Sequence, residues 1–337
     1  MKKNVTVIVL TCILLASFSL ITFGQEKKLA QTGMKFLSLS LGARVSGFGQ
    51  AATSLEDGAA SMFYNPAGMA RLTNLTSVSL GRVSYIADIN YSYAAIAFAP
   101  FDGDYGVIGV NFVNVNYGSF QGTVRANNFQ GFVDVGSFSP KAMAIGIGYS
   151  KALSEKFAVG GNIKYVYQSL GISTIGIDGK GNYITQSNST DVLSFDFGLI
   201  YKTGFKSLDF GMDVKNFSRE VTYIKDSFQL PLIFKMGLSM NIFDLTNINE
   251  NMHSLLLTID ASHPRDYPEQ LSFGGEYTFM KLISLRVGYV TPTDVEGISA
   301  GVGIKHSFSG FNFSLDYAFT SYKEFKNVQR ITIGFAL

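Results

Sequence analysis

The sequence predicts an all-β protein, a transmembrane antiparallel β-barrel of about 14 strands with an N-terminal hatch, or plug, segment in its lumen. Three observations favour this fold. The chain opens with a secretory signal, apolar and polar residues alternate with a period of two from residue 76 onward, and the links between alternating segments are short on one side and long on the other. Charged residues make up only 15% of the chain, against roughly 25% in ordinary soluble domains, which suits a large apolar surface.

Residues 1–24 are expected to be a cleaved signal peptide. Lys2 and Lys3 precede an apolar core at residues 5–23, and small residues lie before Gln25. A membrane anchor is the alternative, but the apolar run is barely long enough to span a bilayer and lacks a charged flank that would stop its transfer. The only cysteine, Cys12, lies in this core, so the mature chain is expected to have no disulfide and no cysteine ligand or nucleophile.

Residues 25–75 are expected to form an N-terminal periplasmic segment and the lumen hatch. Residues 42–72 read GARVSGFGQAATSLEDGAASMFYNPAGMARL, which is rich in Gly, Ala and Ser and ends in the turn sequence Asn65-Pro66-Ala67-Gly68. This pattern fits neither an amphipathic helix nor an alternating strand. A small-residue segment ahead of many strands is typical of a hatch packed inside a barrel. The alternative is a surface loop that leads into the first strand.

Residues 76–337 are expected to form the barrel. The alternation is clearest at residues 311–320, where Phe, Leu and Tyr alternate with Asn, Ser, Asp, Ala and Thr. Most such segments are long enough for the roughly 9–11 residues that cross a bilayer at a tilt. Interruptions near Gly81 and Phe112 indicate β-bulges. The expected strands are 76–87, 90–100, 104–117, 139–152, 157–169, 191–204, 206–216, 231–243, 253–262, 270–280, 282–291, 296–307, 311–322 and 328–337.

The connections favour a membrane barrel over a soluble sandwich, which would show the same alternation. Links after strands two, four, six, ten and twelve are tight, whereas those after strands three, five and seven, at residues 118–138, 170–190 and 217–230, are long. Short turns at one end and long loops at the other are typical of outer-membrane barrels. We therefore expect a protein of the Gram-negative bacterial outer membrane, with lipid around it and both termini in the periplasm. Aromatic girdles at the two interfaces are expected from Tyr85, Tyr91, Tyr149, Tyr289 and Tyr322.

The inward face of the predicted barrel is mostly small and charged. Its mixed signs argue against an open filter of one charge, and its polarity argues against a long-chain fatty acid as ligand. Two interpretations stay open: the charges pair with one another, or they hold a hatch through Arg44, Glu56, Asp57 and Arg71. The inward charges are Lys164, Asp196, Asp209, Asp213, Lys215, Lys235, Asp260, Glu276, Arg286, Lys305, Asp316 and Arg330.

The sequence holds no convincing catalytic, cofactor or metal site. Residues 297–301 match the G-x-S-x-G pattern of serine hydrolases, but they lie inside an alternating strand with no helix after it. Asp260, His263 and Asp266 are close in sequence, yet they straddle a strand end and a loop. The net charge of +2, without a Lys/Arg cluster, gives no reason to expect nucleic acid. We therefore expect neither an enzyme nor a cofactor or metal.

Residues 36–72 resemble the opening of the PorV/PorQ family of outer-membrane proteins, which belongs to the wider class of FadL-type fourteen-stranded barrels. The likeness rests on Gly42-Ala43-Arg44, a Gly-rich turn, an acidic-Ala step and the close Asn65-Pro66-Ala67-Gly68. The rest of the chain is similar only in strand number, loop pattern and the ending RITIGFAL at residues 330–337. In FadL-type barrels the Asn-Pro-Ala segment lies in the lumen, so the resemblance implies plug roles for Asn65, Pro66 and Ala67.

The resemblance also implies a function. PorV/PorQ-type proteins take part in type IX protein secretion by binding secreted cargo, through its C-terminal domain, or surface-complex partners at the outer membrane. Barrel-assembly machinery is a further expected partner during biogenesis. The wider FadL class implies an alternative, the uptake of hydrophobic small molecules through a plugged lumen.

Overall fold

The computed structural model describes residues 32–178, 180, 182–246, 248–249 and 252–337. The expected signal peptide at residues 1–24, with Cys12, lies outside these residues. None of the helices in the described part of the chain is long and apolar enough to cross a membrane.

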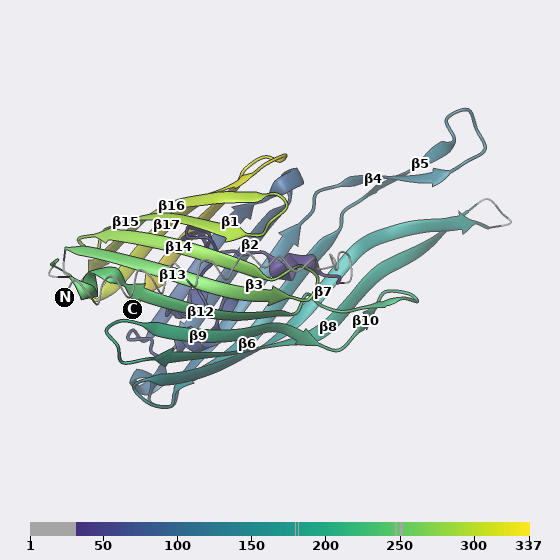
Figure 1. Ribbon diagram of the computed structural model, residues 1–337. Coiled ribbons are helices and arrows are strands. Elements are labelled where there is room, and N and C mark those ends of the chain that lie inside the picture. The colour runs from purple at the N-terminus through teal and green to yellow at the C-terminus, as the bar shows by residue number, and fades with distance from the viewer. Residues whose placement is uncertain (1–31, 179, 181, 247, 250–251) are drawn as a thin grey trace.

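Fourteen antiparallel strands close into a barrel, in which β1 pairs with β2 on one side and with β18 on the other (Figure 1). The expected closed antiparallel barrel and its fourteen strands are confirmed. The barrel strands are β1 (Thr76–Ser84), β2 (Asn90–Phe98), β3 (Val107–Asn116), β6 (Lys141–Ala152), β7 (Phe157–Ile177), β8 (Tyr183–Lys202), β9 (Asp209–Ser218), β12 (Ile233–Asn241), β13 (His253–Pro264), β14 (Gln270–Phe279), β15 (Ile283–Thr291), β16 (Glu296–Phe308), β17 (Phe311–Tyr322) and β18 (Val328–Ala336).

The long links carry strands of their own, which the sequence interpretation missed. The link at 118–138 contains the hairpin of β4 (Phe120–Arg125) and β5 (Phe132–Phe138), and the link at 170–190 is largely an extension of β7 and β8. β10 (Val221–Thr222) pairs with β11 (Ser227–Phe228) in the third. Figure 1 shows the β4–β5 and β7–β8 hairpins projecting beyond the barrel, at the end away from the C-terminus. We call this the hairpin end and the opposite one the short-turn end.

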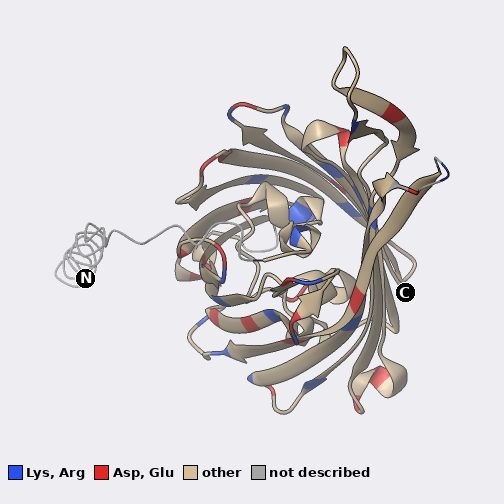
Figure 2. Cartoon of the chain, turned by 90° about the vertical axis from the view of Figure 1, so that its right-hand side faces the viewer, with Lys and Arg blue, Asp and Glu red and all other residues tan. Residues whose placement is uncertain are grey.

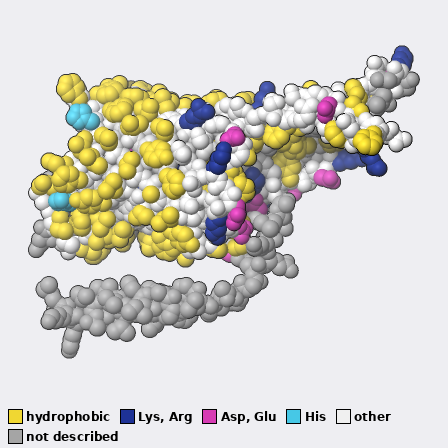
Figure 3. All heavy atoms as spheres, turned by 90° about the horizontal axis from the view of Figure 1, so that it is seen from above, with side chains coloured by type: hydrophobic (Ala, Val, Ile, Leu, Met, Phe, Trp, Pro, Cys, Tyr) yellow, Lys and Arg dark blue, Asp and Glu magenta, His cyan; other side chains and the backbone are white. Residues whose placement is uncertain are grey.

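The outer wall of the barrel carries an apolar band. Ile145 and Ile147 on β6 and Ile163 on β7 point outward, and the side chain of Ile147 is 64% exposed. Figure 3 shows hydrophobic side chains covering the wall away from the hairpins, with charged atoms gathered where the hairpins begin. Exposed aliphatic and aromatic side chains around the outside of a closed barrel form the surface that meets lipid, because so large an apolar surface would be unfavourable in water.

Toward the hairpin end the two faces of the wall exchange polarity. Asn114 and Asn116 point outward and are exposed, whereas Val113 and Val115 point inward and are buried. The pairing of β1 and β3 with their neighbours runs without a register shift, so the bulges expected near Gly81 and Phe112 are absent from these described strands. The strands extend past the lipid, where their outer face meets water and their inner face remains dry. The exchange of polarity therefore comes from the types of side chain along the strand, since the backbone pairing is regular.

The same exchange corrects part of the expected aromatic girdle. Tyr149 and Tyr289 point outward and are each 49% exposed, as a girdle requires. Tyr91 and Tyr322 instead are buried inside the barrel, where Tyr85 packs edge-on between them at ring-centroid distances of 6.0 and 5.9 Å. Tyr91 and Tyr322 lie at the hairpin ends of β2 and β17, and Tyr85 directly follows β1, so these three rings stabilise the interior and not the membrane interface.

The apolar band predicts a difference between two outward positions. Replacing Ile147, in the middle of the band, by Lys is expected to lower the free energy of unfolding in lipid vesicles by about 2–4 kcal/mol, because a lysine at the bilayer midplane loses its hydration. Asn114→Lys, outward but beyond the band, is expected to cost about 1 kcal/mol or less. Equal losses for both variants in guanidinium titrations would contradict the placement of the band.

Candidate functional site

Residues 33–72 lie inside the barrel, and we call them the lumen segment. They form short turns of helix: η2 (Lys35–Ser38), α2 (Ala43–Gly47), η3 (Gly58–Phe63) and η4 (Pro66–Met69). Figure 2, seen from the hairpin end, shows these coils within the ring of strands. Their hydrogen bonds reach the wall on several sides, since the Ala43 amide donates to Thr332 on β18 (2.8 Å) and the Thr53 amide donates to Asp260 on β13 (3.0 Å).

Inward-facing glycines allow the lumen segment to approach the wall. A Cβ atom built on seven of them would lie less than 3.0 Å from an atom of this segment, a distance that real Cβ atoms essentially never show. At Gly211, Gly274 and Gly288 the atoms met are backbone, which cannot swing aside. Only glycine therefore fits at these places. The seven, on β3, β6, β7, β8, β9, β14 and β15, are Gly109, Gly148, Gly160, Gly198, Gly211, Gly274 and Gly288.

The Asn65-Pro66-Ala67-Gly68 sequence is fully buried against β7, β8 and β9. The Asn65 side chain accepts a hydrogen bond from the Ala67 amide (3.0 Å) and so caps η4, where Pro66 takes the first position. Its amide nitrogen lies 3.0 Å from the Leu199 carbonyl of β8 and 3.2 Å from the Met212 carbonyl of β9. It also donates to the Thr53 carbonyl (2.7 Å). Asn65 thus ties two parts of the lumen segment to two strands.

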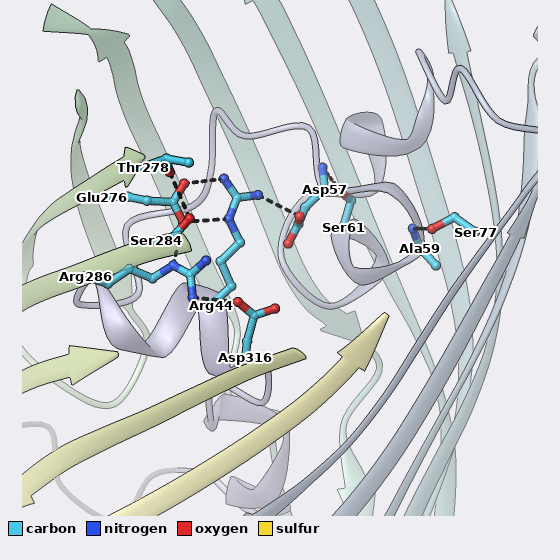
Figure 4. A network of polar contacts seen from close by, with 10 residues as sticks. All are labelled: Arg44, Asp57, Ala59, Ser61, Ser77, Glu276, Thr278, Ser284, Arg286 and Asp316. Atoms are coloured by element: carbon cyan, nitrogen blue, oxygen red, sulfur yellow. Dashed lines mark hydrogen bonds and ion pairs between the residues drawn. The ribbon is translucent and has the colours of Figure 1, made fainter. Parts of the chain in front are cut away.

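Arg44, at the start of α2, joins the lumen segment to the wall at the short-turn end (Figure 4). Its guanidinium forms a two-point ion pair with Glu276 on β14 (2.8 and 3.1 Å) and a second pair with Asp57 (2.7 Å). Arg286 on β15 shares Glu276 and also pairs with Asp316 on β17 (2.6 Å). Bidentate contacts between guanidinium and carboxylate fix orientation as well as charge.

Gly42, the residue before α2, is held by a hydrogen bond within the lumen segment. The Gly42 amide donates to the Tyr64 hydroxyl, which connects the start of α2 to the end of η3. Burial raises the pKa of this Tyr64 hydroxyl well above its usual range, so it stays protonated. Gly42 itself must be small, because a Cβ there would meet the Tyr64 oxygen.

The remaining inward charges lie mostly on β7, β8 and β9. Lys164 pairs with Asp196 at 2.7 Å, and the Lys215 ammonium donates to the carbonyl of Phe63 in the lumen segment. Asp213 is buried, and neither of its carboxylate oxygens has a hydrogen-bond partner among the described residues. Lys235 faces it on β12. Lys305 points into a cavity at the short-turn end.

The contacts include both arrangements that the sequence left open. Lys164–Asp196 and Arg286–Asp316 pair charges within the wall. Arg44–Glu276 and Lys202–Glu56 (3.2 Å) connect the wall to the lumen segment, while Arg71–Glu56 (2.7 Å) lies within that segment. Arg330 on β18 also connects the wall to the lumen segment, since it donates to the Ser40 carbonyl (3.0 Å) and to Thr320 of β17 (2.9 Å).

The interior at the hairpin end is largely apolar, which corrects the expectation of a lumen lined mostly by small and charged residues. Met34, Phe36 and Leu41 of the lumen segment pack there in one buried cluster with wall residues. The sequence signal was present in the interrupted alternation of β1 and β3, but it was interpreted as backbone bulging. The inward wall residues of the cluster include Val83, Tyr91, Tyr93, Val113, Val115, Ala142, Ala144, Val166 and Val192.

A small cavity of about 40 Å³ lies where the apolar and charged parts of the interior meet. Phe36, Leu37 and Phe63 of the lumen segment form one side of it. Lys164 and Asp196 form part of the other. The cavity thus offers mainly apolar contact, with a few hydrogen-bonding groups at one end.

The weaker sequence candidates separate in the structure. Asp260 accepts hydrogen bonds from Thr53, His263 contacts Glu269 at the surface (2.9 Å), and Asp266 pairs with Lys35 (2.6 Å). The described residues contain no group of three acidic, histidine or cysteine side chains that could hold a metal ion. Ser299, the serine of the G-x-S-x-G match, lies inside β16 and donates to Thr320 (3.2 Å), far from the turn that a nucleophile needs.

No protein-family model and no curated protein matches this chain. Solved structures are similar to it in fold. The toluene transporter TbuX of Ralstonia pickettii superposes with a TM-score of 0.60 at 13% identity, covering 88% of this chain and 97% of TbuX. For the toluene transporter TodX of Pseudomonas putida the values are 0.59, 14%, 88% and 98%. For a FadL homologue of Pseudomonas aeruginosa they are 0.54, 12%, 88% and 97%.

At these identities the likeness concerns the fold alone. The fold is that of the FadL-type fourteen-stranded barrels, which points to a bacterial outer membrane. The expectation that the protein is not an enzyme stays a prediction, because a shared fold does not decide activity.

The glycine contacts predict opposite outcomes at two adjacent positions of β14. Gly274 faces the Phe48 carbonyl, so Gly274→Ala is expected to lower the free energy of unfolding in detergent by about 1–3 kcal/mol through overpacking. Gly275 points outward, where a Cβ would meet Leu257 at an ordinary 3.5 Å. Gly275→Ala is expected to change stability by about 0.5 kcal/mol or less. Guanidinium unfolding of both variants tests this, and equal effects would argue that the lumen segment does not press on the wall.

Proposed function

We propose that the protein is an outer-membrane channel that takes up small hydrophobic molecules, with the lumen segment as its plug. The observation that carries this proposal is the apolar inner wall at the hairpin end, where Val113, Val115 and Tyr91 face the lumen while Asn114 and Asn116 face water. The fold shared with two toluene transporters supports it. This is the second of the two roles that the sequence left open.

In this proposal the part of the lumen segment at residues 34–41 occupies the place of the ligand. Met34, Phe36 and Leu41 fill the apolar interior, and the adjoining cavity of about 40 Å³ is smaller than any ring-sized compound. An entering molecule must therefore displace these side chains. The apolar contact that it regains with the wall, at roughly 25 cal/mol per Å² of buried surface, offsets that cost.

The two parts of the lumen segment are suited to different roles. Residues 42–72 are held by Arg44, by Asn65 and by the glycine contacts, so we assign the permanent plug to Gly42, Ala43, Arg44, Asn65, Pro66, Ala67 and Gly68. Residues 34–41 are held mainly by apolar packing, with Lys35–Asp266 as a polar contact near their start and Arg330 bound to the Ser40 carbonyl near their end. Residues 34–41 can therefore be displaced by a ligand while residues 42–72 stay in place.

The apolar wall predicts a loss of uptake when hydroxyl groups replace methyl groups. The double variant Val113→Thr, Val115→Thr keeps side-chain volume but places two hydroxyls in the apolar interior. Burying each hydroxyl is expected to cost about 1 kcal/mol of free energy. Uptake of radiolabelled toluene by cells that carry the variant is expected to fall about tenfold. Asn114→Thr, on the outward face between them, serves as the matched control. An unchanged rate in the double variant, at equal amounts of folded protein, would contradict the proposal.

A second candidate function, binding of a protein partner, is favoured by the projecting hairpins. Phe129 at the tip of the β4–β5 hairpin is fully exposed, and Ile172 and Ile175 on the β7–β8 extension are 62% and 61% exposed. Exposed apolar side chains beyond the lipid commonly mark interaction sites. This is the role that the PorV/PorQ resemblance implies, with type IX secretion components or cargo C-terminal domains as partners. None of the three similar structures is of a secretion protein.

Co-purification from native outer membranes separates the two functions. If the hairpin binds a protein, the variant Phe120→Ser, Phe129→Ser, Phe132→Ser is expected to lose that partner while its toluene uptake stays normal, because the hairpin lies outside the lumen. Phe101→Ser, an equally exposed change at the short-turn end, is the control. Recovery of the same proteins with the triple variant would argue against a docking role.

A further inference from the structure

A cavity of about 890 Å³ lies at the short-turn end, on the other side of the lumen segment from the apolar interior. Arg44, Asp57 and Tyr64 of the lumen segment form its inner limit. The surrounding wall comes from the short-turn ends of β13 to β18 and from the start of β1. Figure 4 looks into the region where its charged groups meet. The volume is that of a site for a small molecule or a short polymer.

The charges of this cavity are unequally satisfied. Its carboxylates, Glu56, Asp57, Glu276 and Asp316, are each paired with an arginine at 2.8 Å or less. Two lysines, Lys281 and Lys305, also line it, and among the described residues neither has a carboxylate within ion-pair distance. Within the part of the chain that the structure describes, the cavity therefore holds two ammonium groups without an anionic partner.

The two lysines are held near each other by strand pairing. The Lys305 amide on β16 donates to the carbonyl of Leu282 (2.8 Å), the residue after Lys281. Lys281 lies in the two-residue turn between β14 and β15, where both Met280 and Lys281 have positive φ, as that tight turn requires. Lys305 occupies an inward position of β16, opposite Ser314 of β17. The backbones of the two lysines are therefore neighbours, and both residues line the cavity.

The groups around these lysines are hydroxyls and amides. Thr278 and Ser284 are hydrogen-bonded to each other (2.8 Å), and Ser307 contacts Asn312. All four line the cavity, as does Ser314 on β17. Such groups both donate and accept hydrogen bonds, so they suit a hydrophilic molecule and disfavour a hydrocarbon.

We propose that this cavity binds a hydrophilic anion, carrying carboxylate or phosphate groups, through Lys281 and Lys305. The arginines already hold carboxylates, so the lysines supply the attraction, and the low-dielectric barrel wall strengthens the field of unpaired charge inside. The site goes beyond hydrophobic uptake, because the lumen segment separates it from the apolar interior. It gives the short-turn end, which we expect to face the periplasm, a ligand chemistry of its own.

Protection of the two lysines from acetylation tests the proposal. The full-length mature protein in detergent is treated with acetic anhydride at constant ionic strength, with citrate, with inorganic pyrophosphate or with chloride alone, and modification is followed by mass spectrometry. Citrate or pyrophosphate is expected to slow acetylation of Lys281 and Lys305 about tenfold relative to chloride. Lys326, exposed between β17 and β18 at the hairpin end, is expected to react equally in all three. Protection by citrate alone identifies carboxylate as the preferred group, and protection by pyrophosphate alone identifies phosphate.

Two variants test whether the protection depends on Lys305 itself or only on the total charge of the protein. Lys305→Gln is expected to abolish the protection of Lys281 without loss of folding, because the side chain projects into open space, whereas Lys326→Gln removes the same charge and is expected to leave it intact. Equal acetylation in all three anions, or protection that survives Lys305→Gln, would overturn the proposal. Toluene uptake measured on the same variants is expected to be unchanged, so failure here is distinguishable from failure of the channel function.

Discussion

The close approach of the lumen segment to inward-facing glycines is the constraint on which the rest of the structure depends. Fourteen paired strands close the wall, so its diameter cannot adjust to what lies inside. Backbone atoms of Phe48, Gly49 and Thr53 lie within 2.2 Å of where the Cβ atoms of Gly274, Gly288 and Gly211, respectively, would be. The small residues of the segment and the glycines of the wall together allow this close packing. The hydrogen bonds of Arg44 and Asn65 then fix the position of the segment.

Along its axis the interior has two chemistries, which the lumen segment keeps apart. At the short-turn end, ion pairs and hydroxyls surround a hydrophilic cavity. At the hairpin end, Phe36 and Leu41 pack against Val113, Val115 and Tyr91. Water cannot easily fill an apolar lumen, and a hydrocarbon gains nothing in a polar one. The division explains why an apolar ligand and a hydrophilic anion can both be proposed for one barrel without competing for one site.

The sequence predicted the barrel well because its signal is local. The barrel strands were placed to within a few residues, except at the hairpin ends of β7 and β8, since alternation and turn residues act between near neighbours. The same locality caused the errors. The break in alternation near Phe112 was interpreted as a bulge, because alternation alone does not say which face of a strand meets water. Tyr91 and Tyr322 were assigned to the lipid interface for the same reason, although they lie inside the barrel. The glycines of the wall are visible in the sequence, but nothing local distinguishes Gly274 from Gly275.

What the sequence by itself determined is the closed sheet: its strand number, the asymmetry of its ends and the presence of a segment that does not alternate. These follow from residue periodicity and from the need of every backbone group for a partner in lipid. Only the tertiary structure decided which charges meet, as Arg44 with Glu276, and which end of the lumen is apolar. Arg44 and Glu276 are 232 positions apart, and they meet only when closure brings distant strands around one interior.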